Sequence, residues 1–93
     1  DLKATFVECD GGSLVVMEGG KKRRIRGADL ATDEGFLALL DKIANAPKQR
    51  IVFLVRENGV GTYYAARNLA RSKMCVHLRL TLTGTREKPW KTA

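Results

Sequence analysis

A continuous hydrophobic run at residues 51–55, with the sequence IVFLV, is followed by a turn and then by a helical period. Because the run is short and uniformly apolar, it predicts an interior strand that is covered on both faces. Asn58 and Gly59 follow as a turn dipeptide, since both residue types tolerate positive φ. Thr62 can then serve as the N-cap of a helix, which the apolar period predicts to run to about Lys73.

A second helical period precedes this strand. Its apolar residues recur at the spacing of one buried helix stripe, and they are Phe36, Leu37, Leu40, Ile43 and Ala44. Thr32 or Asp33 can cap this helix, and the acidic residues at its start favour the positive end of its dipole. Pro47 stops the helix, which we expect to end at about Ala46.

Strict alternation marks the last strand. One face is apolar and contains Val76, Leu78, Leu80 and Leu82, whereas the other contains His77, Arg79, Thr81 and Thr83. The pattern predicts a strand whose apolar side packs on the core and whose polar side meets water. Together with the strand at 51–55 and the helix between them, it forms a βαβ unit with parallel strands.

The beginning of the chain predicts a β-hairpin. Residues 4–9 and 13–17 are rich in strand-forming residues, and Asp10-Gly11-Gly12 between them has the chemistry of a hairpin turn. Residues 21–26, with the sequence KKRRIR, then form either a short edge strand or a loop. Like charges crowded in this way must be solvated, and a charged edge discourages unwanted strand pairing.

These elements predict one small α/β (α+β) domain over residues 1–83, with a polar C-terminal tail at 84–93. The order is β-β-(β)-α-β-α-β, with a mixed sheet of four to five strands and both helices on one face. The opposite face must then be polar, covered by another chain, or free as a binding surface. The chain contains no apolar run of membrane-spanning length. It begins with Asp1 and not with Met, so we expect a domain or fragment of a longer protein.

The composition adds a strong positive charge. A net charge of +7 and a pI near 9.9 favour acidic partners such as nucleic acid. The candidate polyanion-binding residues are Lys21, Lys22, Arg23, Arg24 and Arg26, with reinforcement from Arg67, Arg71 and Arg79. Such binding would release counterions from phosphates and weaken steeply with salt. The alternative is a solvated basic edge that only protects the hairpin from aggregation.

The sequence gives little support for a catalytic function. The only histidine, His77, has no carboxylate near it in the sequence, so no nucleophile with a positioned base is evident. Cys9 and Cys75 have no metal-ligand spacing, and they are either semi-buried thiols or a disulfide. We therefore expect no catalytic residue, no metal site and no cofactor, and a protein that is not an enzyme.

Gly59 and Gly61, between a strand and a helix N-terminus, are a candidate phosphate-binding loop. The match is incomplete, because Tyr64 stands where a dinucleotide fingerprint needs its third glycine, and the Gly-Lys-Ser/Thr of a P-loop is absent. The alternative is that both glycines serve the geometry of the turn.

Several segments resemble the soluble domain of the ExbD/TolR family of biopolymer-transport proteins. They are residues 7–11 (VECDG), 37–40 (LALL), 51–55 (IVFLV) and 62–70 (TYYAARNLA), within a match that spans most of residues 4–83. Parts of the chain are also similar to uncharacterised bacterial domains. The ExbD/TolR resemblance implies a periplasmic domain that is tethered to a membrane helix, dimerises and receives peptide segments. The functional acidic residue of that family lies in a membrane segment outside this sequence, so no site residue is transferred.

Two functional hypotheses follow. The first is a protein-interaction and assembly domain that uses a sheet edge or the open sheet face to bind a protein partner or to form a homodimer. The alternative is polyanion binding through residues 21–26. The location is periplasmic if the family resemblance holds and cytoplasmic otherwise.

Overall fold

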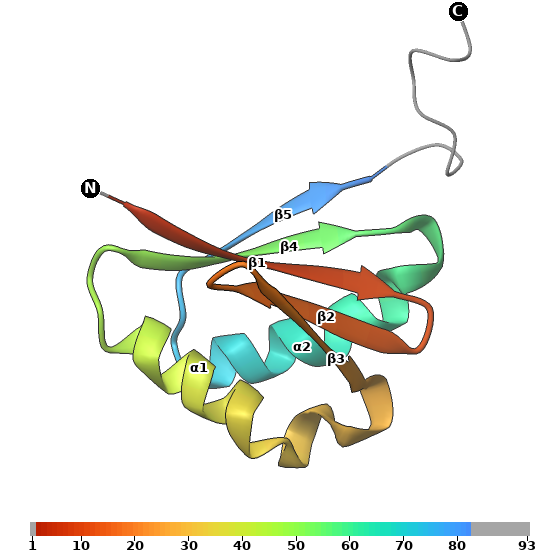
Figure 1. Cartoon of the computed structure of the whole chain (residues 1–93), viewed down its shortest axis with the longest axis horizontal. Coiled ribbons are helices and arrows are strands. Elements are labelled where there is room, and N and C mark those ends of the chain that lie inside the picture. Colours follow the sequence, from red (N-terminus) through yellow and green to blue (C-terminus); the bar gives the residue numbers. More distant parts are fainter. Residues whose placement is uncertain (1, 83–93) are drawn as a thin grey trace, which may run out of the picture.

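The computed structural model describes residues 2–82, which form a five-stranded mixed sheet with one layer of helices (Figure 1). The strands are β1 (Lys3–Asp10), β2 (Ser13–Glu18), β3 (Lys21–Arg26), β4 (Gln49–Val55) and β5 (His77–Thr81). The α-helices are α1 (Glu34–Ala44) and α2 (Val60–Ser72), and the short 3₁₀ helices are η1 (Gly27–Thr32) and η2 (Glu57–Gly59). The predicted fold class, a small α/β (α+β) domain with a mixed sheet, is confirmed.

The sheet order is β3-β2-β1-β4-β5, so β3 and β5 are its two edges. β2 pairs antiparallel with β1 on one side and with β3 on the other. The pairing of β1 with β2 is the hairpin that the sequence predicts. Gly12 in the first turn and Gly19 and Gly20 in the second have φ values of 86°, 59° and 78°. These left-handed conformations are accessible to glycine at little cost, which explains both tight turns. Residues 21–26 therefore form an edge strand and not a loop.

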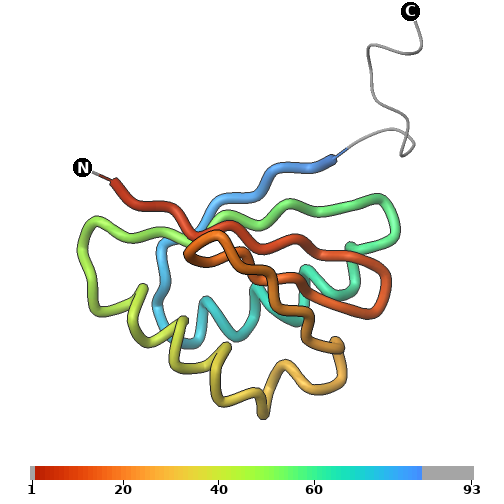
Figure 2. Tube along the Cα trace, in the orientation of Figure 1, coloured from red at the N-terminus to blue at the C-terminus, as the bar shows by residue number. Residues whose placement is uncertain are grey.

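The second half of the sheet is parallel. β4 pairs in parallel with β1 on one side and with β5 on the other, which confirms the predicted βαβ unit. Both α-helices lie on the same side of the sheet (Figure 2). The prediction that β4 is covered on both faces is therefore wrong, because the helical layer covers only one.

The core lies between the sheet and the helical layer. The sheet contributes Val7, Cys9, Leu14, Val16, Ile25, Ile51, Phe53 and Val55, and the helical side contributes Leu30, Phe36, Leu39, Leu40, Ile43, Tyr63, Ala66 and Ala70. Burial of this apolar surface is the main force that holds the helices on the sheet.

Asp33 caps α1, because its carboxylate accepts the backbone N–H of Phe36 at 2.8 Å. For α2, the predicted cap is wrong. The helix begins at Val60, two residues before Thr62, since η2 turns the chain directly into the helix. Thr62 is therefore a buried residue of the first helical turn.

The predicted tail at residues 84–93 lies outside the described residues. Within residues 2–82, the structure contains no helix that is long and apolar enough to cross a membrane.

Candidate functional site: the open sheet face and the β5 edge

The face of the sheet opposite the helices has an apolar side and a basic side. Cross-strand neighbours on this face form two rows, Lys22-Met17-Phe6-Val52-Leu78 and Arg24-Val15-Glu8-Leu54-Leu80. Leu78 and Leu80 on β5 are each 52% exposed, and Phe6 is 42% exposed. Val52 is buried between its neighbours, although no helix covers it. The open face therefore presents leucines at the β5 edge and cations at the β3 edge.

The predicted orientation of β5 is wrong. Leu78 pairs with Val52 and Leu80 with Leu54, so the apolar side of β5 lies on the open face. Arg79 pairs with the core residue Phe53 and lies on the helix side. Alternation alone identifies two faces of a strand but not the face that the helices cover.

The helix side of β5 is aromatic and basic. The Arg79 guanidinium lies 5.6 Å from the centre of the Tyr63 ring. The Arg67 guanidinium lies 5.7 Å from the same ring and 4.8 Å from that of Tyr64. His77 stands edge-on to Phe53, with ring centres 6.0 Å apart. We call Tyr63, Tyr64, Arg67, His77 and Arg79 the arginine–tyrosine cluster.

The three arginines of β3 form hydrogen bonds or ion pairs with nearby residues. Arg23 forms two hydrogen bonds to the Asp33 carboxylate, at 3.2 and 2.9 Å, and Arg26 lies 3.3 Å from Asp29. Arg24 donates to the Ser13 hydroxyl at 2.5 Å and lies 3.6 Å from the Asp10 carboxylate.

The Arg23 pair has an electrostatic consequence. The hydrogen bonds from Arg23, together with the N–H of Phe36, lower the pKa of Asp33 below its ordinary range. The same pair raises the pKa of Arg23. The basic strand is therefore bound locally to the loop that precedes α1.

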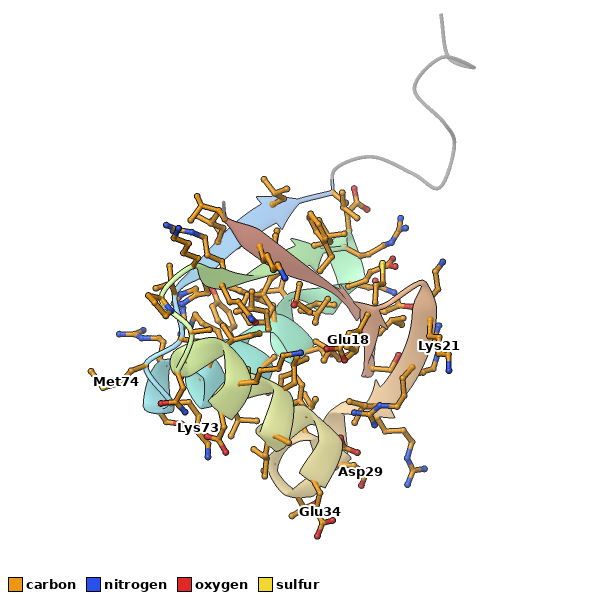
Figure 3. The ribbon with its side chains drawn as sticks, turned by 60° about the vertical axis from the view of Figure 1, so that its left-hand side comes forward. Glu18, Lys21, Asp29, Glu34, Lys73 and Met74 are labelled. Carbon is orange, nitrogen blue, oxygen red and sulfur yellow. The ribbon has the colours of Figure 1, made fainter. Side chains whose placement is uncertain are left out.

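Lys21 and Lys22 have no acidic partner among residues 2–82, and both are exposed. In the register of β2 and β3, Lys21 is the partner of Glu18 at the turn, but the Glu18 carboxylate pairs with Lys42 of α1. Figure 3 shows Lys21 at the outer edge of the sheet. Arg79 lies on the opposite edge strand, about 19 Å away by strand spacing. Arg67 packs beside it over Tyr63. The structure thus does not bring these two arginines together with residues 21–26 into one basic patch.

The two candidate loop glycines differ in their surroundings. A Cβ at Gly59 would lie 2.0 Å from the carbonyl oxygen of Cys9, so the close approach of η2 to β1 requires glycine. A Cβ at Gly61 would meet nothing within 4 Å, and this residue lies in the first turn of α2. The close packing of η2 on β1 therefore accounts for Gly59 without a ligand.

Both cysteines are buried free thiols. Burial, together with the negative charge of Glu8, raises the pKa of Cys9 to about 12. Burial also raises the pKa of Cys75, whose Sγ lies 3.1 Å from the carbonyl oxygen of Leu40 and donates to it. Among the described residues, no three His, Cys, Asp or Glu side chains gather as a metal site.

Comparison with models of known protein families, with curated proteins and with solved structures gives no match. The ExbD/TolR resemblance therefore stays a prediction.

Proposed function

We propose that this chain is a non-enzymatic protein-interaction and assembly domain whose interface is the open sheet face near β5. The observation that carries the proposal is the pair Leu78 and Leu80. These side chains are half exposed on an edge strand, and they continue the apolar surface of β4. Contiguous apolar surface of this kind marks interaction sites in soluble proteins.

The two leucines can supply part of the energy of an interface. Full burial of a leucine side chain contributes about 1.5–3 kcal/mol, so covering the remaining half of Leu78 and of Leu80 contributes about 1.5–3 kcal/mol in total. Phe6, in the same row as Leu78, extends the surface. Polyanion binding through β3 has less support, because Arg23, Arg24 and Arg26 already lie beside carboxylates.

The test measures molar mass by sedimentation equilibrium over a range of concentrations. We expect the wild-type mass to rise with concentration through contact of open faces, and we expect Leu78→Lys/Leu80→Lys to abolish the rise. Val60→Lys is the matched control, because Val60 is 45% exposed but lies on α2.

A parallel titration with generic duplex DNA and RNA, at low and moderate salt, tests the alternative. A chain that stays monomeric and binds nucleic acid in a salt-sensitive manner would contradict the assembly proposal. So would self-association that the double leucine variant leaves unchanged.

A further inference from the structure

The outer edge of β5 has free backbone hydrogen-bonding groups. The N–H of Ile51 donates to the carbonyl of Val76 at 3.0 Å, and the N–H of Leu82 donates to the carbonyl of Val55 at 2.8 Å. Residues 76 and 82 therefore turn their backbone groups toward β4, and by alternation so do Leu78 and Leu80. His77, Arg79 and Thr81 turn theirs outward, and no strand within residues 2–82 pairs with them.

Two different side-chain rows border this edge. On the open face lie the exposed leucines Leu78 and Leu80. On the helix side lie His77 and Arg79, with Arg67 of α2 beside them over the Tyr63 ring. A strand added at this edge would place alternate side chains beside each row.

Within residues 2–82, no ion pair involves the basic row of His77, Arg79 and Arg67. The ion pairs of residues 2–82 engage six carboxylates, those of Glu8, Asp10, Glu18, Asp29, Asp33 and Asp41. None of these pairs includes Arg67 or Arg79. Moreover, the Nε atom of Arg67 is buried without a hydrogen-bond partner among the described residues. Unlike the arginines of β3, these cations are available to an incoming acid.

We infer that the partner is an extended peptide segment that adds to the β5 edge, with apolar residues alternating with acidic residues. The apolar residues contact Leu78 and Leu80, and the acidic residues pair with Arg79 and its neighbours in the arginine–tyrosine cluster. This inference rests on the proposed function and specifies the chemistry of the partner.

Charge argues against a second copy of β5 as the occupant. Antiparallel self-pairing sets residues 77, 79 and 81 of one copy against the same three positions of the other. Arg79 would then face Arg79, His77 or Thr81, none of which is acidic. Like charges directly opposite one another destabilise a strand pair, whereas opposite charges stabilise it.

The test titrates the full chain with three short labelled peptides and measures fluorescence anisotropy. Valine alternates with glutamate in the first peptide, with serine in the second and with lysine in the third. We expect the glutamate peptide to bind about tenfold more tightly than the serine peptide, since each cross-strand charge pair contributes a modest amount. We expect the lysine peptide to bind most weakly, and added salt to reduce the difference.

Two changes test the details of the contact. Arg79→Glu should remove the preference for glutamate and favour the lysine peptide, whereas Arg71→Glu on exposed helix surface is the control for net charge. Methylation of alternate peptide nitrogens, in the register whose N–H groups face β5, should abolish binding, whereas methylation in the other register should not.

The outcomes separate this inference from the proposed function. If the three peptides bind equally, or if Arg79→Glu leaves the preference unchanged, the acidic partner is refuted while the interface stands. If no peptide binds but the chain still associates through Leu78 and Leu80, strand addition is refuted and the proposed function survives. If no peptide binds and the double leucine variant has no effect on mass, both are refuted.

Discussion

Met74 lies in a backbone conformation that disfavours its side chain, and its replacement by glycine should stabilise the protein. Its φ is 62°, and no other non-glycine residue in the described part of the chain has a positive φ. It follows the C-cap of α2, where its N–H donates to the carbonyl of Arg71 at 3.0 Å and that of Cys75 donates to the carbonyl of Ala70 at 2.9 Å. This bonding is the Schellman motif, in which glycine is the usual residue at this position.

The size of the effect follows from two opposing terms. A side chain in the left-handed region costs about 1–2 kcal/mol, which glycine avoids. Glycine also makes the unfolded chain more flexible, which costs about 0.4–1 kcal/mol. Met74 is 85% exposed and points away from the body (Figure 3), so its removal sacrifices little packing. Met74→Gly should therefore raise the free energy of unfolding by about 0.8 kcal/mol, which is the difference between the midpoints of the two ranges.

Urea denaturation followed by far-ultraviolet circular dichroism measures this difference. The matched control is Met74→Ala, which removes the same exposed side chain but keeps a Cβ in the left-handed conformation. We expect the alanine variant to resemble the wild type and the glycine variant to unfold at higher urea. For a domain of this size, each 1 kcal/mol also corresponds to a rise of about 4–8 °C in Tm. Equal stability of the two variants would refute the assigned backbone strain.

Three further predictions concern stability. Gly59→Ala should cost about 2–3 kcal/mol by its clash with the Cys9 carbonyl, whereas Gly61→Ala should be neutral or stabilising by about 0.5 kcal/mol in thermal denaturation. Asp33→Ala should cost about 1–2 kcal/mol at neutral pH through loss of the N-cap. Because the folded pKa of Asp33 is lowered from 3.8, its contribution disappears as pH falls below that value, and acid titrations of both proteins should converge. The Cys9 thiol, with its pKa raised from 9.0 to about 12, should resist thiol reagents at pH 8 until the protein unfolds. The free energy of unfolding should fall as pH rises from 9 toward 12, and less so in Cys9→Ala. A native thiol that reacts as fast as the denatured one would contradict the burial argument.

The sequence predicts the elements of this fold well, because each carries a local signal. The glycine turns, the helical stripe of α1 and the alternation of β5 all depend on neighbours within a few residues. Which side of β5 faces the helices does not depend on neighbours within a few residues. It depends on α2, which packs on the helix side of β5 and is not part of its alternation pattern. Tyr63 and Arg67 of α2 lie beside β5 there, so the helix side of β5 accepts Arg79 where an apolar residue would otherwise be expected.

The candidate site was therefore only partly visible in the sequence. The sequence predicts an open sheet face but assigns Leu78 and Leu80 to the core. Their place beside Phe6 and Leu54 on the open face arises from the pairing of strands that are distant in sequence. The basic run is evident in the sequence. Its ion pairs with Asp10, Asp29 and Asp33 appear only when β3 folds against the loops around it.

The two sheet edges differ in a way that supports the β5 edge as the interface. Five of the six residues of β3 are Lys or Arg, a composition that prevents unwanted strand pairing. β5 has one arginine between two half-exposed leucines, and its outward backbone groups are unpaired within residues 2–82. An edge of this kind promotes association with other chains unless a partner covers it. We therefore expect, in sedimentation equilibrium, that charging β5 by Leu78→Lys/Leu80→Lys suppresses association through the open face. Removing charge from β3 by Lys21→Ser/Lys22→Ser should instead add association at the β3 edge.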